Sequence, residues 1–569
     1  MRSSTSCGSE ERTTRRINGL EVVFRKGRPP TEAQYPGLNQ RMVIDEELGM
    51  IIEYDVAVPM RDGVKIYVNI YRPKNEGDKV PAIVAWEVYG KHRPEHTLWR
   101  YRKGCGVSDA DLSKYAGFEG PDPAYWVPRG YAVVYADPRG VWGSEGDATF
   151  FSDQEAQDCY DLIEWIARQP WCNSKVGMTG VSYLAWIQYK VAALNPPHLA
   201  AINPWEGASD FYRELATHGG IPCIFLPWLL RERWCFSQGY VEDLEEMFKR
   251  HPLFDEYWKS KTVDFSRITT PAFIVASWSD HGLHTRGTLE AFKRIASKDK
   301  WLRVHGRKKW QDYYQNVELQ RKFFDRFLKD IDNDVKYWPR VYIEIRERYF
   351  VGNFRAENEW PIARTKYTKL FLDAESGAMS LMPISRESSI SYDAQNGRAI
   401  FEYMFTEKTE LTGYMKLRLW VEARGSDDMD LFVAIDKIDR AGERVAFPHE
   451  SMFDDGPVAK GWLRVSHREL DEERSTPWQP VHKHERELKL KSGEIVPVDI
   501  EIWPSSTLFR RGEKLRLIIQ GKDIYAPWYR HPQTVNKGEH IIYTGGKYDS
   551  HLLIPIVPPK EYEDPDIGY

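Results

Sequence analysis

The stretch KVGMTGVSYLAWIQYKVAA, residues 175–193, decides the fold of this chain. It starts with a short apolar run typical of a buried strand, bends after Gly180, and continues with apolar residues at helical spacing. Ser182 stands at the bend. This serine is either a nucleophile raised on a tight turn or the N-cap of a helix, and the surrounding sequence has to decide between the two interpretations.

Strands and helices alternate around this stretch. Apolar runs at 80–90, 129–146, 270–280 and 300–306 predict buried parallel strands, and the helical spacing over 153–172 predicts a covering helix. Alternation of this kind is typical of an α/β fold, with a parallel sheet and helices on its faces. Open sheets of this class carry their functional residues on the loops that follow the strands, which is where Ser182 lies.

Composition and the spacing of apolar residues divide the chain into five parts. We expect an N-terminal extension that begins as a disordered tail (1–40), a first part of the α/β core opening with a strand meander (41–195), an all-helical cap (196–264), a second part of the core (265–335) and a β-rich domain (336–569). In the last part short β-rich runs alternate with polar turns, which predicts a β-sandwich of the jelly-roll kind.

Composition excludes several classes of protein. A net charge of −5 over 569 residues leaves no basic excess for binding nucleic acid. No apolar run approaches the roughly 20 residues of a membrane span, and the N-terminus lacks the apolar core of a secretory signal.

The six cysteines are widely spread, without zinc-site spacing. We therefore expect no zinc site and reduced thiols in a cytoplasmic protein. A serine nucleophile calls for no metal and no organic cofactor. The sequence leaves the oligomeric state open and allows a homodimer.

Three residues with hydrolytic chemistry follow three successive predicted strands: Ser182, Asp280 and His305. A hydroxyl is a poor nucleophile unless an imidazole takes its proton and a carboxylate orients that imidazole, and α/β hydrolases present these groups in this chain order. Each residue alone has an ordinary structural explanation, but the three together favour catalysis. His281 and His284 are rival bases, less favoured because they precede the last strand and share a loop with Asp280.

Several motifs carry a family resemblance. PMRDGVKIYVNIYRP (59–73), RGYAVVYADPRGVWGSEG (129–146), DLIEWIARQPWCNSKVGMTGVSYLAW (161–186) and ASWSDHGLHTRG (276–287) resemble, in collinear order, the cocaine-esterase and X-Pro dipeptidyl-peptidase family of serine hydrolases. The resemblance spans roughly residues 45–525 and implies an α/β-hydrolase core with a helical cap insertion and a C-terminal jelly roll. The elbow of that family is G-x-S-Y-x-G, in which Ala185 replaces the last glycine here. The match favours Ser182 as a nucleophile.

The resemblance also implies roles for other residues. The family's oxyanion donors correspond to the backbone N–H of Tyr183 and to the hydroxyl of Tyr89, in the segment EVYGKH. Many relatives end the last strand with G-P-W-x-H, which would put Lys309 at the position of the catalytic histidine. Another branch resembles W-L-x-x-H-G-x-x-x-W, which WLRVHGRKKW follows, and this motif makes His305 the expected base.

These residues together predict attack by Ser182 on an ester, amide or thioester of a small molecule, followed by hydrolysis of the acyl-enzyme. Four alternatives stay open: an acyltransferase, if the cap excludes water; an X-Pro dipeptidyl-peptidase, which needs a cap acid such as Glu206, Asp210 or Glu214 to hold the peptide amine; a non-hydrolytic cyclase or lyase of a biosynthetic pathway; and a binding module attached to an inactive hydrolase.

Overall fold

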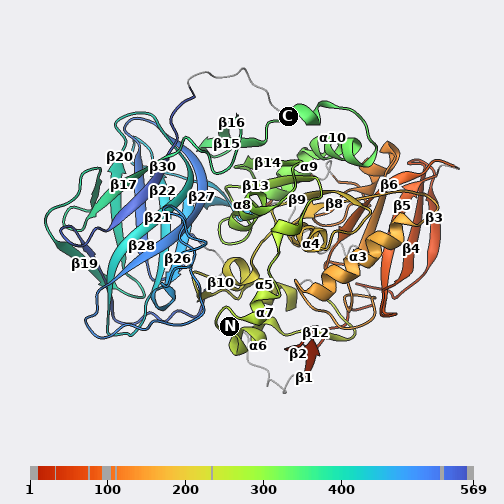
Figure 1. Ribbon diagram of the computed structural model, residues 1–569, viewed down its shortest axis with the longest axis horizontal. Helices are drawn as coiled ribbons and strands as arrows, with labels where there is room; N and C mark the ends of the chain where they lie inside the picture. Colours follow the sequence, from red (N-terminus) through yellow and green to blue (C-terminus); the bar gives the residue numbers. More distant parts are fainter. Residues whose placement is uncertain are drawn as a thin grey trace.

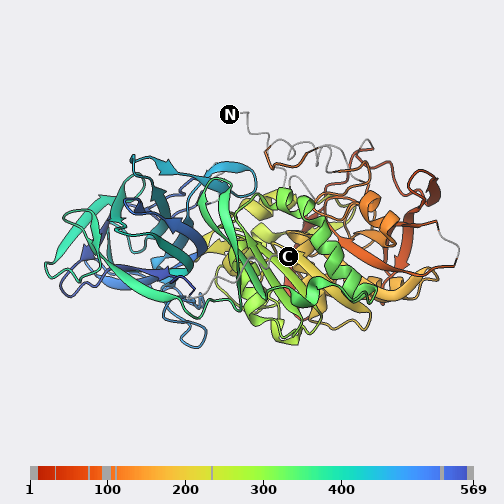
Figure 2. The same ribbon diagram turned by 90° about the horizontal axis from the view of Figure 1, so that it is seen from above.

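A computed structural model describes residues 11–32, 34–74, 77–92, 104–108, 112–231, 235–525 and 531–560. The chain forms two lobes, an α/β lobe and a C-terminal β domain drawn in teal to blue (Figures 1 and 2). Residues 1–10, with Cys7 and the first part of the predicted tail, lie outside the described residues. Within the described ranges, no helix combines the length and the apolar character needed to cross a membrane.

A mixed central sheet organises the α/β lobe. Its order is β3-β4-β5-β7-β6-β8-β9-β13-β14-β15-β16, in which β7 to β15 run parallel and the outer strands antiparallel. The strands are β3 (Arg41–Asp45), β4 (Met50–Pro59), β5 (Lys65–Pro73), β6 (Val80–Trp86), β7 (Ala132–Asp137), β8 (Cys172–Val181), β9 (Leu199–Trp205), β13 (Ala272–Ser277), β14 (Lys300–His305), β15 (Val341–Arg348) and β16 (Val351–Glu357). The predicted α/β class and opening meander are therefore confirmed.

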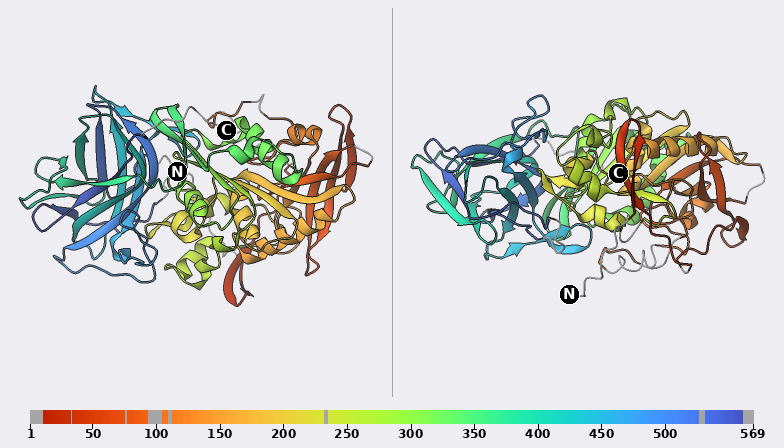
Figure 3. Two further views of the ribbon diagram at one scale, coloured as in Figure 1. Left: turned by 45° about the horizontal axis from the view of Figure 1, so that its top comes forward. Right: turned by 90° about the horizontal axis from the view of Figure 1, so that it is seen from below.

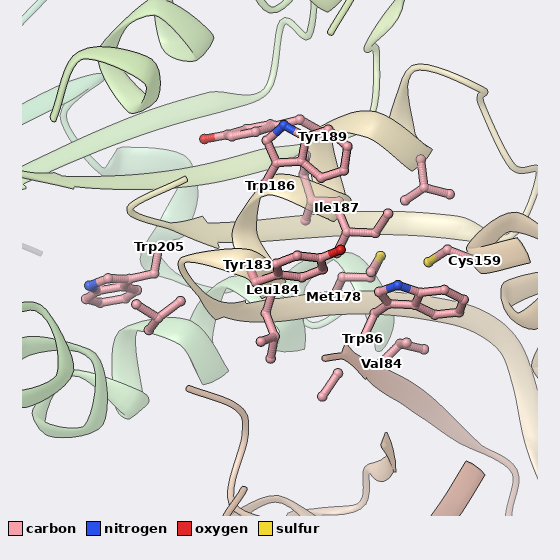
Figure 4. Close-up of a cluster of buried hydrophobic side chains, with 14 of the residues drawn as sticks. Val84, Trp86, Cys159, Met178, Tyr183, Leu184, Trp186, Ile187, Tyr189 and Trp205 are labelled. Carbon is pink, nitrogen blue, oxygen red and sulfur yellow. The ribbon is translucent and has the colours of Figure 1, made fainter. Parts of the chain in front are cut away.

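Helices cover both faces of this sheet. They are α2 (Pro123–Trp126), α3 (Asp153–Ala167), α4 (Tyr183–Ala192), α8 (Thr285–Arg294), α9 (Lys309–Gln315) and α10 (Val317–Leu328). Successive residues of a strand face opposite ways. On β8, Gly177 faces α10, because a Cβ there would lie 2.8 Å from Leu328 and from Phe324. The next residue, Met178, packs beneath α4 in the buried cluster of Figure 4.

The cap is the part of the chain that connects β9 to β13, and it lies beside the C-terminal domain (Figures 1 and 3). It contains the π-helical turn η3 (Tyr212–Ala216), β10 (Thr217–His218), β11 (Ile221–Pro222), α5 (Phe225–Leu229), β12 (Tyr240–Glu242), α6 (Leu244–Arg250) and α7 (Glu256–Lys259). The prediction of an all-helical cap starting at residue 196 is wrong on two points. The cap contains strands, and residues 199–205 form β9, which pairs in parallel with β8. A short apolar run between prolines does not reveal by periodicity whether it is a strand or a helix.

The N-terminal extension is also more ordered than predicted. β1 (Arg12–Ile17) and β2 (Leu20–Lys26) form a hairpin around Asn18 and Gly19, which both have positive φ. Asn-Gly is the pair that favours a two-residue hairpin turn. The mostly polar residues of β1 hide this strand from a hydrophobic-pattern argument. β2 also pairs with β12, so the hairpin is attached to the cap.

The C-terminal β domain has a hydrophobic core of its own. Its strands are β17 (Lys366–Asp373), β18 (Ala378–Ser380), β19 (Ser388–Asp393), β20 (Arg398–Met404), β21 (Thr409–Arg424), β22 (Asp430–Ile438), β23 (Arg444–Val445), β24 (Phe447–His449), β25 (Phe453–Gly456), β26 (Ala459–Arg464), β27 (Val496–Phe509), β28 (Lys514–Gln520), β29 (Glu539–Thr544) and β30 (His551–Ile556). β15 and β16 follow the expected boundary at 336 but extend the central sheet. β15 also pairs with β27, which couples the two lobes.

Candidate active site

Ser182 occupies a strained turn between β8 and α4. Its φ of 62° and ψ of −111° are uncommon for a residue with a side chain, and its hydroxyl caps no helix N–H. The turn is tight, since a Cβ on Gly180 would lie 2.4 Å from the Cβ of Leu184. The Ser182 N–H donates to the carbonyl oxygen of Trp205 over 3.1 Å. This geometry is that of a nucleophile elbow rather than of an ordinary helix cap.

The imidazole beside Ser182 belongs to His284. His284 Nε2 lies 3.0 Å from Ser182 Oγ and 4.0 Å from Asp280 Oδ2. A single turn of the chain brings the His284 imidazole to the Asp280 carboxylate. In this turn the N–H groups of Leu283, His284 and Thr285 all donate to the Asp280 carbonyl oxygen. Residues four apart in such a turn lie on the same side of the chain.

His305, the base expected from the sequence, lies elsewhere. Its Nε2 is 3.0 Å from Glu206 Oε1 and 3.4 Å from Asp312 Oδ2, and its Nδ1 accepts the N–H of Arg307. The structure thus brings Ser182 and Asp280 to the same site but turns His305 toward buried carboxylates. The motif correctly places His305 at the end of β14, but not the direction in which its side chain points.

His281, the second rival base, is held at the lobe boundary. Its Nε2 lies 3.1 Å from the carbonyl oxygen of Pro504, and its Nδ1 accepts the N–H of Lys460 over 3.0 Å. Burial lowers its pKa well below the ordinary value for histidine. These contacts give His281 a structural role in joining the two lobes.

Lys309 forms a buried ion pair with Asp280. Its Nζ lies 3.0 Å from Asp280 Oδ2, and both side chains are almost fully buried. Burial alone would raise the pKa of Asp280, but the charges of Lys309 and His284 outweigh it and hold that pKa below its ordinary value. Burial likewise opposes the Lys309 charge, but the carboxylates of Asp280, Glu119 and Glu206 raise the pKa of Lys309. Lys309 is therefore an ammonium ion.

Tyr89, an expected oxyanion donor, forms a hydrogen bond with the buried side chain of Glu119. Its hydroxyl donates to Glu119 Oε2 over 2.6 Å, and Trp310 Nε1 donates to the other carboxylate oxygen over 2.8 Å. Burial raises the pKa of Glu119 to about 7, although Lys309, Tyr89 and Trp310 oppose the rise. The direction of the Tyr89 O–H therefore depends on whether Glu119 carries a proton.

The side chain of Tyr183 belongs to the core, and its backbone N–H opens α4 next to Ser182. The Tyr183 hydroxyl donates to Glu155, which also accepts the indole N–H of Trp86. Figure 4 shows Tyr183 lying near Met178 and Trp86 in this cluster. Only the amide of Tyr183 is thus placed for chemistry at the elbow.

Ser182, His284 and Lys309 line one cavity of about 340 Å³, together with Tyr89 and Glu119. All three parts of the molecule contribute to its wall: Tyr89, Glu119, Phe151, Ser182, Tyr183, Trp186, Leu283, His284, Lys309 and Trp310 from the core; Ala208, Leu215, Phe225, Leu226, Trp228 and Leu229 from the cap; and Glu450, Met452 and Phe453 from the β domain. The wall is mostly apolar, and its polar side chains include Ser182 and His284. Such a cavity suits a largely apolar ligand.

Sequence reasoning ranked His284 too low and missed Glu119 and Glu450. The Asp-x-x-x-His spacing of residues 280–284 was the available signal for His284, because it fits one turn of chain. Glu119 and Glu450 carry no motif, and only the cavity brings them to Ser182.

Comparison with known proteins gives matches over most of the chain. Residues 62–236 match the X-Pro dipeptidyl-peptidase (S15 family) model, and residues 332–553 match the X-Pro dipeptidyl-peptidase C-terminal non-catalytic domain. A cocaine esterase of Rhodococcus sp. (strain MB1 Bresler) is 24% identical, over 88% of this chain and 98% of that protein. A CocE/NonD family hydrolase from Staphylococcus aureus is 46% identical, with a TM-score of 0.87 over 92% of this chain and 97% of that one. An α-amino acid ester hydrolase, 16% identical with a TM-score of 0.69, shares the fold.

Proposed function

Because the chain belongs to the CocE/NonD family of serine hydrolases, we propose that it cleaves an ester or amide bond of a small, largely apolar molecule through an acyl-enzyme on Ser182. The observation that carries this proposal is the 3.0 Å contact between Ser182 Oγ and His284 Nε2, on the wall of an apolar cavity. A hydroxyl at hydrogen-bond distance from an imidazole is the arrangement that activates a serine.

The reaction follows from these positions. As Ser182 Oγ attacks the carbonyl carbon, its proton passes to His284 Nε2, and the imidazolium is stabilised by Asp280 at 4.0 Å. The Tyr183 amide and the Tyr89 hydroxyl stabilise the oxyanion, each by about 3 kcal/mol. His284 then gives its proton to the leaving group, and water attacks the acyl-enzyme with His284 as base again.

In this proposal His284 takes the role that the sequence assigned to His305. It also replaces the histidine that many relatives have at the position of Lys309. The Lys309 ammonium pairs with Asp280 over 3.0 Å instead. Lys309 thereby keeps Asp280 ionised beside His284, so that the buried carboxylate is available to an imidazolium.

The apolar wall favours a substrate with an aliphatic or aromatic group over a dipeptide with a free amine. Among the described residues, the three cap acids that could hold such an amine are engaged: Glu206 contacts His305, Asp210 pairs with Arg213, and Glu214 pairs with Arg286. None of the three lines the cavity. Transfer to an alcohol or amine instead of water, and cyclase or lyase chemistry, are weaker alternatives that no contact of the site favours.

Finer expectations are part of the same proposal. We propose that the C-terminal β domain is a jelly roll, that the core, cap and β domain are the units of the chain, and that the protein acts in the cytoplasm as a homodimer. Among the described residues, five cysteines are buried thiols, which supports a reducing compartment. The exposed side chains of Met42, Val43 and Ile44 on the outer strand β3 support an interface between two copies.

Labelling with a fluorophosphonate tests the site, because only an activated serine reacts with this probe. We expect the wild type to label, Ser182→Ala not to label because it lacks the reacting hydroxyl, and His284→Gln to label at least about 10³-fold more slowly because it lacks the base. His305→Gln is the matched control, a histidine of the same buried region outside the Ser182 contact. Folding of each variant is checked by circular dichroism.

Two outcomes would sink the proposal. One is a folded wild type that does not label, which would move the search to non-hydrolytic chemistry. The other is normal labelling of His284→Gln together with loss in His305→Gln, which would return the role of base to His305.

The double variant His284→Gln/Lys309→His is expected to regain labelling, because it restores an imidazole at the position that the family resemblance indicates.

A further inference from the structure

Three side chains with metal-binding chemistry meet at the boundary between the cap and the C-terminal domain. They are His218, at the end of β10, Cys223, one residue after β11, and His531, in the segment after β28. Their ligand atoms all lie within 4.8 Å of one another. Each residue is at most 5% exposed, and none of them lines the cavity at Ser182.

The hydrogen bonds of the two histidines fix where their lone pairs point. His218 Nε2 lies 3.0 Å from the carbonyl oxygen of Glu214, and His531 Nδ1 lies 2.7 Å from Asp523 Oδ1. Both oxygens accept hydrogen bonds only, so each of these ring nitrogens carries a hydrogen. In neutral imidazoles the other nitrogens, His218 Nδ1 and His531 Nε2, are then bare.

These two bare nitrogens face each other at 2.7 Å. Two lone pairs at that distance repel unless a cation or a proton lies between them. The thiol of Cys223 stands at the same point. Imidazole and thiolate are the ligands that zinc and similar transition metals prefer.

The residues around His218, Cys223 and His531 resemble those around the metal ions of known metalloproteins. Metal-bound histidines usually donate their second ring N–H to a carboxylate or a backbone carbonyl, and His531 and His218 do so here. Ile221, Phe432, Trp462 and Trp503 form a buried apolar cluster, and the Trp462 ring stacks on His218 with centroids 4.7 Å apart. An apolar shell strengthens electrostatic binding because it excludes water.

We propose that His218, Cys223 and His531 bind one divalent transition-metal ion of the Zn²⁺ class, which joins the cap to the C-terminal β domain. Two imidazole ligands of tetrahedral zinc lie about 3.3 Å apart, so the rings would separate slightly on binding. Cys223 lies two residues before Phe225, the first residue of α5 and part of the cavity wall. The ion would therefore fix the cap side of the cavity without touching the reacting atoms.

Sequence spacing could not indicate this site. His218 and Cys223 are close in the chain, but His531 follows some 300 residues later, so no zinc-binding motif is formed. The expectation that the chain binds no metal rested on such spacing and on a reaction at Ser182 that needs no metal.

Metal binding to the full chain tests the proposal independently of its activity. After treatment with a chelator, the protein is titrated with Co²⁺, which reports a thiolate ligand by intense charge-transfer absorbance. We expect one equivalent to bind with this absorbance, and Zn²⁺ to displace it. Cys223→Ala and His531→Gln should lower the affinity at least about 100-fold, and Asp523→Asn, which only orients His531, about 10- to 100-fold.

Cys235→Ala is the matched control, because Cys235 is another buried thiol of the cap region and lies outside the cluster. It should bind Co²⁺ as the wild type does. Absence of the charge-transfer band in folded wild type would overturn the proposal and assign the 2.7 Å contact to a shared proton on His531. Unchanged Co²⁺ binding in both Cys223→Ala and His531→Gln would also overturn it, since the ion would then be held elsewhere.

Discussion

At the scale of single residues, Glu119 controls the direction of the Tyr89 hydroxyl. As a carboxylate, Glu119 accepts the Tyr89 O–H at 2.6 Å. As a neutral acid, it can donate to the Tyr89 oxygen instead and leave the O–H free for a substrate oxyanion. Because burial raises the pKa of Glu119 to about 7, both forms exist near neutral pH. In the proposed mechanism, Tyr89 is therefore the better oxyanion donor on the acid side of that value.

This argument predicts a falling limb in the pH dependence of activity. The kcat/KM for an activated ester should decrease as pH rises through about 7, where the Glu119 proton is lost. Glu119→Gln should remove this step and stay active at higher pH, because an amide can accept from Trp310 and donate to Tyr89. Tyr89→Phe should also lack the step, with a rate at least about 10²-fold lower throughout. Identical profiles for the wild type and Glu119→Gln would refute the role of Glu119.

At the scale of elements, the turn between β8 and α4 decides whether the serine is presented at all. Gly180 has a φ of 151°, and a Cβ there would lie 2.4 Å from Leu184. Ala185 stands where the family motif has its last glycine, and it fits because it faces Gly207, where a Cβ would lie 3.3 Å away. The elbow thus depends on one glycine before the serine and on small side chains after it.

Gly180→Ala is predicted to distort the turn at Ser182, because the added Cβ would clash with the Cβ of Leu184, which cannot move away without moving the backbone. We expect the free energy of unfolding to fall by about 2–3 kcal/mol and fluorophosphonate labelling to slow. Gly63→Ala is the control, since Gly63 also has a positive φ but its Cβ would meet no atom within 4 Å. Denaturant titration compares the two. Equal losses would mean that backbone strain alone, and no clash, accounts for the effect.

At the scale of the whole molecule, the cavity exists because three parts of the chain converge. The β domain contributes Met452 and Phe453 to the wall, and the N–H of Glu450 donates to the Ser279 carbonyl oxygen over 2.8 Å, next to Asp280. The C-terminal domain therefore shapes the cavity, whereas the groups to which we assign the reaction all lie in the α/β lobe.

Met452→Ala should consequently alter substrate preference and leave the chemistry intact. Removing this side chain enlarges the cavity, so the ratio of kcat/KM for long over short acyl esters should rise about 10-fold, as expected for a few methylene groups. Fluorophosphonate labelling should persist. Met382→Ala, an exposed methionine of the same domain, should leave the ratio unchanged. A shift of equal size in both variants would argue against contact between Met452 and the substrate.

Much of this architecture was accessible from the sequence because it depends on local patterns. Apolar runs of strand length alternated with helical spacing, so the parallel sheet and the strand–serine–helix turn at Ser182 could be predicted. Strand β9 could not, since its short run between prolines carries no distinctive period. The hairpin of β1 and β2 was missed because one of its strands is mostly polar.

By itself, the sequence determined the α/β class, the position of the elbow and the family resemblance, because backbone preferences and hydrophobic periodicity act between neighbours in the chain. Tertiary packing sets which imidazole meets Ser182, since His284 follows β13 and His305 ends β14, and the two differ in where their side chains point. It alone also brought His531 to His218 and Cys223. The physical reason is the same in both cases: contacts between distant residues are set by packing, which no local pattern records.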